Sequence, residues 1–327
     1  MQLIDNHGRP ISYLRLAVTD RCNLRCFYCM PEEGVKYLPK PHLMTFEEML
    51  RMARIMAQMG ISKVRITGGE PFVRNELMRF LKDLKAIEGI EQIHITTNGV
   101  LTAPLIPELK DLGINSVNLS LDTLDRERFK EMTRRDELPQ VLATLERLIE
   151  HEIPTKINAV VMAGKNDQDI LPLVELTKTK PVSVRFIEEM PFNGSGINKE
   201  AFMSHTSIVN LIKKQYPSLH KLTDEPHSTS YNYSINGHQG TVGVIAAYSR
   251  TFCGTCNRIR VTPTGTLKTC LYDDGVLNIR DLLRSDASDF DISEKLKNAF
   301  THRSKDGFEA EAKRSKLVTE SMTTIGG

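Results

Sequence analysis

The stretch "TDRCNLRCFYCMP", residues 19–31, holds three of the chain's six cysteines. Cys22, Cys26 and Cys29 follow a CxxxCxxC spacing. A structural zinc site normally takes four Cys or His ligands, and no histidine lies near these three cysteines to supply the fourth. An iron–sulfur cubane held by only three thiolates leaves one iron open to substrate chemistry. The spacing therefore favours an iron–sulfur cluster over zinc.

Composition narrows the class of protein. A chain of 327 residues with 40% apolar and 26% charged content can bury a large core without disulfides. We find no signal-peptide pattern and no apolar run of membrane-spanning length, so we expect neither secretion nor a membrane anchor. The cysteines then indicate metal ligands or catalytic thiols in a reducing cytoplasm. The formal net charge of +2 provides no large single-sign field for nucleic acid or a membrane surface.

Short strand-like runs alternate along the chain with segments of helical apolar spacing. The runs cover residues 13–19, 63–69, 92–99, 116–123, 155–162 and 182–190. Thr45 and Glu48 form a capping-box pattern before one helical segment, and Gly60 and Gly113 stand where helix C-termini are expected. Six βα units with right-handed crossovers predict an α/β fold whose parallel sheet curls into an open or partial (β/α)6 barrel.

Alternation within these runs separates an apolar face from a polar face. Helices would cover the apolar face, which turns the polar face toward the lumen of the barrel. Five basic residues fall on that polar face: Arg15, Lys63, Arg65, Lys156 and Arg185. Buried cations are costly unless an anion pairs with them, so the pattern predicts an anionic ligand. The alternative is that these residues lie on the surface of an ordinary open sheet.

The first motif resembles the radical S-adenosylmethionine superfamily. Its cysteines carry an aromatic residue, Tyr28, before the last one, and "GGEP" follows at residues 68–71. The resemblance implies a partial barrel and a [4Fe-4S] cluster on Cys22, Cys26 and Cys29. Adjacent glycines let backbone carbonyls approach a ligand closely. The residues implied around S-adenosylmethionine are Tyr28, Gly68, Gly69, Glu70, Ser120 and Met190.

A second set of three cysteines lies in "FCGTCNRIRVTPTGTLKTCLY", residues 252–272. By spacing alone, Cys253, Cys256 and Cys270 fit a zinc ribbon completed by a distant histidine or by Asp273. Together with the first motif, however, they resemble the GTP 3',8-cyclase family of molybdenum cofactor biosynthesis. That resemblance runs from "RLAVTDRCN" to the terminal "IGG" and implies a second [4Fe-4S] cluster, on Cys253, Cys256 and Cys270, whose open iron faces guanine.

The resemblance assigns further residues to the substrate. Around GTP it implies Arg15, Lys63, Arg65, Thr96, Lys156, Arg185, Arg258, Ile259 and Arg260. Arg258 and Arg260 share one side of an extended segment, from which guanidinium groups can reach phosphate oxygens. Gly326 and Gly327 would reach into the cavity and join these two arginines in catalysis. The family commonly carries a small residue and an acid where this chain has "PT" at 263–264, which affects only the expected turn shape.

The implied organisation is a radical core barrel over residues 1–220 and a C-terminal α+β region over 221–327 that carries the second cluster and the Gly-Gly tail. The implied activity is the S-adenosylmethionine-dependent conversion of GTP to (8S)-3',8-cyclo-7,8-dihydroguanosine 5'-triphosphate. An electron donor, a downstream cyclic pyranopterin monophosphate synthase and a homodimer are the implied partners.

Two other classes of protein stay open at this point. A radical enzyme that modifies a peptide can also carry auxiliary clusters, but it generally uses more than the three remaining cysteines. A zinc-stabilised nucleic-acid-binding protein would need a basic face with interleaved aromatic residues, whereas only 6% of this chain is aromatic.

Overall fold

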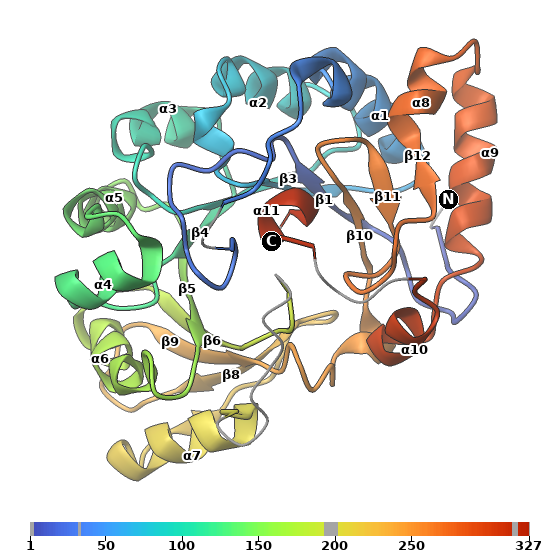
Figure 1. Cartoon of the computed structure of the whole chain (residues 1–327). Coiled ribbons are helices and arrows are strands. Elements are labelled where there is room, and N and C mark those ends of the chain that lie inside the picture. Colours follow the sequence, from blue (N-terminus) through green and yellow to red (C-terminus); the bar gives the residue numbers. More distant parts are fainter. Residues whose placement is uncertain (1–2, 32–33, 193–201, 316–319, 327) are drawn as a thin grey trace.

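The computed structural model describes residues 3–31, 34–192, 202–315 and 320–326. Within these ranges a twelve-stranded sheet runs in the order β12-β11-β10-β1-β2-β3-β4-β5-β6-β9-β8-β7 (Figure 1). The strands are β1 (Tyr13–Ala17), β2 (Lys63–Thr67), β3 (Gln92–Thr97), β4 (Ser116–Ser120), β5 (Thr155–Val161), β6 (Ser183–Glu188), β7 (His220–Lys221), β8 (Ser230–Ser234), β9 (Thr241–Ile245), β10 (Arg258–Val261), β11 (Thr266–Lys268) and β12 (Leu277–Asn278).

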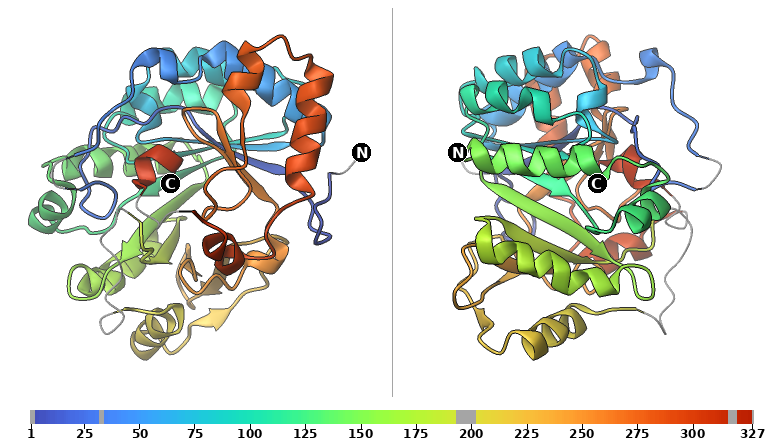
Figure 2. Two further views of the ribbon diagram at one scale, coloured as in Figure 1. Left: turned by 45° about the vertical axis from the view of Figure 1, so that its right-hand side comes forward. Right: turned by 90° about the vertical axis from the view of Figure 1, so that its left-hand side faces the viewer.

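Helices cover the outer face of the curved sheet (Figures 1 and 2). The helices outside the sheet are α1 (Phe46–Gln58), α2 (Leu77–Lys85), α3 (Ile106–Asp111), α4 (Arg126–Thr133), α5 (Leu138–Glu150), α6 (Ile170–Thr179), α7 (His205–Gln215), α8 (Ile279–Arg284) and α9 (Asp289–Phe300). The two short helices α10 (Gly307–Ala312) and α11 (Met322–Ile325) pack instead in a small cluster beside the cavity, and α11 lies inside the curve of the sheet (Figure 1). Strands β1 to β6 pair in chain order and in parallel, with helices between them. The α/β partial barrel expected from the sequence is confirmed.

The C-terminal part of the chain widens this barrel at both edges. Strand β10 pairs in parallel with β1, and β9 pairs in parallel with β6. Antiparallel strands then extend each edge, β11 and β12 beyond β10, and β8 and β7 beyond β9. Residues far apart in the sequence therefore face each other across one lumen. The proposed division into residues 1–220 and 221–327 stays a prediction.

Local sequence signals account for the elements that carry the barrel. Thr45 and Glu48 form the expected capping box at the start of α1. Gly60 follows that helix with φ of 102°, a conformation that favours glycine. On β1 the side chains of Leu14 and Leu16 are fully buried in the outer core beneath the helices, while Arg15 faces the other way. The alternation of the sequence thus sets which face lines the lumen.

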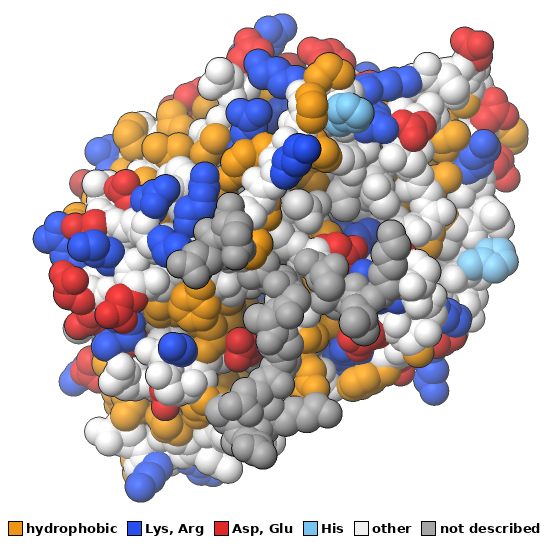
Figure 3. Space-filling view, viewed as in Figure 1, with side chains coloured by type: hydrophobic (Ala, Val, Ile, Leu, Met, Phe, Trp, Pro, Cys, Tyr) orange, Lys and Arg blue, Asp and Glu red, His pale blue; other side chains and the backbone are white. Residues whose placement is uncertain are grey.

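In the described part of the chain, no helix combines the length and apolar character that crossing a membrane requires. The face shown in Figure 3 mixes basic and acidic side chains. This mixture agrees with the small formal net charge of +2.

We expect Phe186→Ala to lower the free energy of unfolding by about 3–5 kcal/mol, because it leaves a cavity in a close-packed core. The Phe186 side chain is fully buried between β6 and the helices outside it. Phe290→Ala is the matched control, since Phe290 is 70% exposed on α9 and its loss should cost less than about 0.5 kcal/mol. Urea unfolding of the metal-free chain measures both. Equal losses would contradict the core assignment.

Candidate functional site

A cavity of about 420 Å³ lies inside the curve of the sheet. Fifteen residues singled out in the sequence line it: Arg15, Tyr28, Cys29, Lys63, Arg65, Thr96, Ser120, Lys156, Arg185, Met190, Cys253, Cys256, Arg258, Arg260 and Cys270. The cavity is within the size range of ordinary ligand sites. One structure therefore brings together residues that the chain separates by more than two hundred positions.

The first cysteine loop follows β1 and is held from two sides. Met30 and Cys29 donate their backbone N–H groups to the carbonyl of Cys26, at 2.9 and 3.0 Å. Arg25 donates its backbone N–H to the carbonyl of Thr133, which ties the loop to the end of α4. All three cysteines are free thiols, and Cys29 is the one that reaches the cavity wall. Burial raises the pKa of the Cys22 thiol to about 11.

The "GGEP" segment packs behind this loop rather than on the cavity wall. A Cβ atom on Gly69 would lie 2.2 Å from the carbonyl oxygen of Arg21, so only glycine fits there. Glu70 is fully buried and accepts hydrogen bonds from the Asn98 N–H and the Thr97 hydroxyl, at 2.7 and 2.8 Å. The close backbone approach expected from the glycines is thus made to the cysteine loop. Contact of Gly68, Gly69 and Glu70 with S-adenosylmethionine stays a prediction.

Tyr28 is oriented by a carboxylate that sequence reasoning did not assign. Its hydroxyl donates to Asp122 Oδ2 at 2.6 Å, and Asp122 also lines the cavity. Burial raises the pKa of Asp122 to about 6, although the Tyr28 hydrogen bond opposes the change. Asp122 stands two residues after Ser120, on the same polar face of its segment. The alternation used to find the lumen was therefore the signal that could have identified it.

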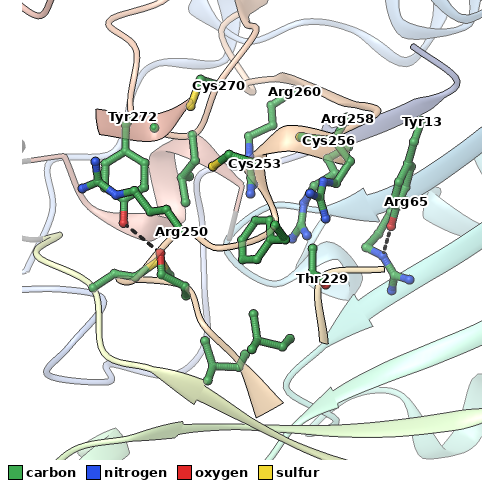
Figure 4. Close-up of a pocket in the computed structure, with 18 of the residues that line it drawn as sticks. Tyr13, Arg65, Thr229, Arg250, Cys253, Cys256, Arg258, Arg260, Cys270 and Tyr272 are labelled. Carbon is green, nitrogen blue, oxygen red and sulfur yellow. Dashed lines mark hydrogen bonds between the residues drawn. The ribbon is translucent and has the colours of Figure 1, made fainter. Parts of the chain in front are cut away.

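Strand register aligns the basic residues in rows. Arg260 on β10 lies opposite Arg15 on β1, which lies opposite Arg65 on β2. In the next row Arg258 and Lys63 flank Tyr13 in the same way. Figure 4 shows Arg258 and Arg260, which lie two positions apart on β10, close to the second set of cysteines. Like charges directly opposite each other destabilise a sheet, so these rows need a compensating anion.

Burial and the neighbouring cations both lower the pKa values of the basic residues in the lumen. Burial, followed by the charge of Arg260, lowers the pKa of Arg15 well below its usual value. Burial and Arg258 lower the pKa of Arg260 to about 10, and burial and Arg185 lower that of Lys156 to about 8. Each cation is thus held in surroundings that disfavour its charge. A polyanion in the cavity would relieve that cost.

Several buried polar atoms on the cavity wall lack a partner among the described residues: Arg15 Nε, Thr96 Oγ1, Asn118 Oδ1, Asn158 Oδ1 and Arg185 Nε. Buried donors and acceptors are normally satisfied in folded proteins. These donors and acceptors therefore fit a polar ligand that fills the lumen.

The second set of cysteines lies at one end of the charged rows (Figure 4). Cys253 and Cys256 bracket a single 3₁₀ turn, η5 (Cys253–Thr255), directly before β10. Cys270 follows β11, and Asp273 accepts its backbone N–H at 2.8 Å. Asp273 thereby holds the turn that presents Cys270. Within the described residues no three Cys, His, Asp or Glu side chains are grouped to hold a single metal ion.

One thiol of this set differs electrostatically from the other two. Burial would raise the pKa of Cys256, but the guanidinium groups of Arg258 and Arg303 outweigh it and lower that pKa to about 6. Burial raises the pKa of Cys270 to about 11. A thiolate is the form of cysteine that binds metals, and the two guanidinium groups favour that form at Cys256.

The remaining assigned residues lie as follows. The Ile259 side chain is fully buried in the outer core, so only its backbone could contact a ligand. Gly326 accepts a hydrogen bond from Arg260 Nη1 at 2.7 Å through its carbonyl oxygen. Ser321, just before α11, donates its hydroxyl to the carbonyl of Cys29. The segment before the C-terminus therefore touches the first cysteine loop and the basic residue Arg260, whereas Gly327 lies outside the described residues.

Comparison with known proteins decides the family. Residues 16–177 match the Radical SAM superfamily, and residues 182–308 match Molybdenum Cofactor Synthesis C. The chain is 40% identical to the mitochondrial GTP 3',8-cyclase of Arabidopsis thaliana, covering 99% of this chain and 83% of that one. It is also 40% identical to GTP 3',8-cyclase of Syntrophomonas wolfei, covering 99% of this chain and 100% of that one.

The chain belongs to the GTP 3',8-cyclase family of radical SAM proteins. It is 42% identical to human molybdenum cofactor biosynthesis protein 1, covering 89% of this chain and 46% of that protein. The chain thus spans about half the length of that relative. Its place in the radical SAM superfamily makes S-adenosylmethionine and one [4Fe-4S] cluster its cofactors.

Solved structures of other proteins share the fold of this chain. The crystal structure of Streptococcus suis SuiB superposes with a TM-score of 0.62 at 14% identity, covering 92% of this chain and 72% of that one. The structure of anSMEcpe with bound AdoMet superposes with a TM-score of 0.59 at 18% identity, covering 89% of this chain and 80% of that one. At such low identity the likeness concerns the fold alone.

We expect iodoacetamide to label Cys256 of the metal-free chain before Cys253 and Cys270 at pH 7. A pKa of about 6 leaves Cys256 mostly as thiolate at that pH, while burial keeps the other two protonated. Its labelling rate should rise as the pH increases through about 6. Mass spectrometry of tryptic peptides gives the rates, and Arg258→Gln should slow the reaction. Equal labelling of all three thiols would contradict the electrostatic difference.

Proposed function

We propose that this chain is a GTP 3',8-cyclase that converts GTP to (8S)-3',8-cyclo-7,8-dihydroguanosine 5'-triphosphate, the first step of molybdenum cofactor biosynthesis. The observation that carries the proposal is a single cavity with three free cysteines toward each end and rows of guanidinium groups between them. This arrangement suits a substrate with a polyanionic part and a base. The family relatives named GTP 3',8-cyclase support the same reaction.

Cys22, Cys26 and Cys29 would hold the first [4Fe-4S] cluster, and Tyr28, Ser120 and Met190 would surround S-adenosylmethionine beside it. When bound, these cofactors would supply radical chemistry for the removal of the 3' hydrogen of the GTP ribose. The protein's part is to orient the ligands and exclude water. Asp122 fixes the direction of the Tyr28 hydroxyl, and the tight packing of Gly69 fixes the cysteine loop.

Cys253, Cys256 and Cys270 would hold a second [4Fe-4S] cluster facing the guanine. The triphosphate would then pair with the basic rows, where charge-assisted hydrogen bonds to guanidinium are strong. The residues proposed to contact GTP are Arg15, Lys63, Arg65, Thr96, Lys156, Arg185, Arg258, Ile259 and Arg260. With the base and phosphates held apart in this way, the ribose would lie between them, within the cavity that Tyr28, Ser120 and Met190 also line.

An external electron donor would reduce the first cluster, and cyclic pyranopterin monophosphate synthase would consume the product. We also propose a homodimer and a role for Gly326 and Gly327 in arranging the cavity. Arg260 already donates to the Gly326 carbonyl, which supports a tail position beside the substrate.

The two other classes have less support. A peptide-modifying enzyme would share the fold of SuiB, but the sequence identity to it is 14%. A zinc-stabilised nucleic-acid-binding protein would present a basic face, whereas the surface in Figure 3 mixes both charges.

The decisive experiment is anaerobic reconstitution followed by incubation with S-adenosylmethionine, dithionite and GTP. We expect roughly eight irons per chain, as two cubanes require, together with 5'-deoxyadenosine and a cyclised nucleotide. Cys26→Ala should abolish S-adenosylmethionine cleavage because the electron source is lost. Cys256→Ala should keep a reducible first cluster but lose cyclisation. Normal turnover of GTP by Cys256→Ala would overturn the role of the second site.

Replacing Arg258 with Gln should weaken GTP binding by about tenfold or more, since a charge-assisted hydrogen bond contributes on the order of 1.5 to 3 kcal/mol. Arg258 is preferred to Arg260, which also holds the Gly326 carbonyl. Arg79→Gln on exposed α2 is the control, because its side chain is 78% exposed. Equilibrium dialysis with iron analysis of the same samples separates lost binding from lost clusters. Unchanged affinity at full iron content would move the triphosphate elsewhere.

A further inference from the structure

Arg303 is a buried arginine in contact with the second cysteine set, and sequence reasoning did not identify it. The residue lies just after the end of α9, and its side chain is only 3% exposed. Arg303 Nη1 donates to the carbonyl of Cys256 at 3.3 Å, and Nη2 lies 3.8 Å from Cys256 Sγ. Nη2 also donates to the carbonyls of Arg258 and Thr269, each at 3.0 Å. One guanidinium thus binds the backbone on both sides of the site and touches a ligand sulfur.

The N-terminal residues hold Arg303 in place. The fully buried carboxylate of Asp5 pairs with Arg303 Nη1 at 3.0 Å and with Arg9 Nε at 2.7 Å. Arg9 in turn donates to the carbonyl of Cys253 at 3.1 Å. A buried guanidinium is stable only when it is paired and hydrogen-bonded, and Asp5 provides that pairing. Two cations and one anion therefore surround the Cys253–Cys256 turn.

No such group of charged side chains surrounds the first cysteine set within the part of the chain that the structure describes. Among the described residues, the side chain that donates to a sulfur there from outside the loop is the neutral amide of Asn98, 3.6 Å from Cys22 Sγ. Arg25 contacts that loop through the carbonyls of Cys22 and Leu24, not through sulfur. The two sites thus differ in the charge placed against their ligands.

We propose that Asp5, Arg9 and Arg303 form a clamp that positions the second three-cysteine site, and that Arg303 raises the reduction potential of the cluster bound there. The proposal rests on the proposed function, because it requires that second cluster. One-electron reduction adds one negative charge to the cluster and its thiolates, with no bond broken and no proton required. A cationic donor at a ligand sulfur stabilises that added charge. All three are positioning residues.

The test uses two substitutions with opposite expected signs. Arg303→Met removes the cation at nearly constant length and should shift the potential of the second cluster to more negative values. Asp5→Asn removes the compensating anion at constant shape and should shift it to more positive values. Both are made in full-length chains that carry Cys26→Ala, so that the second cluster is observed alone. Anaerobic redox titration followed by electron paramagnetic resonance gives the potentials.

Iron content tests the positioning part of the proposal. If Arg303→Met loses the second cluster, Arg303→Lys should recover iron because it restores the charge. Arg128→Met is the matched control, since Arg128 on α4 pairs with buried Asp169 at 2.6 Å, and among the described residues its guanidinium group forms no hydrogen bond with either cysteine set. It should change neither iron content nor potential.

If Arg303→Met and Asp5→Asn shifted the reduction potential in the same direction, the electrostatic role would be overturned. A loosened loop alone would shift the potential in the same direction in both variants. Unchanged iron and unchanged potential in both would overturn the clamp altogether. A failure of the proposed function is seen separately, in the chain without substitutions, as about four irons rather than about eight.

Discussion

The rest of this structure depends on cations that face one another across neighbouring parallel strands. Arg260, Arg15 and Arg65 occupy one row of the sheet, and each is surrounded by groups of its own sign. Burial and the neighbouring arginines lower the pKa values of Arg15 and Arg260, so the protein's own groups in the lumen disfavour these charges. The fold supports this arrangement because the opposite face of the same strands packs a continuous apolar core against the helices.

The pairing of β10 with β1 extends this arrangement to the second cysteine set. Strand β10 adds its arginines beside β1, and the turn before it carries Cys253 and Cys256. The same register that aligns the charges therefore fixes the distance between the cysteines and the basic rows. Arg258 serves both, because it faces the lumen and lowers the pKa of Cys256. The basic rows and the second cysteine set therefore share one side chain and belong to one site.

Sequence reasoning reached the features that repeat locally. Alternation identified the lumen-facing set from Arg15 to Arg185, and the capping box at Thr45 was found in place. It did not identify contacts between residues that are far apart in the sequence. Arg303 meets Asp5 across 298 positions, and no periodicity connects them. Glycines 68 and 69 were singled out by their motif, but their packing against the cysteine loop required the three-dimensional arrangement.

The position of Gly326 follows from the same crowding. Its φ is 76°, and a Cβ atom there would lie 2.8 Å from both Ala17 Cβ and Thr67 Oγ1. Only a residue without a side chain can bring its carbonyl to Arg260 at this point. A carbonyl is a neutral acceptor, whereas a phosphate oxygen carries charge and forms the stronger hydrogen bond to guanidinium. The contact between Arg260 and Gly326 is therefore one that an anionic ligand can compete for, so binding in the lumen and placement of the tail are linked through a single side chain.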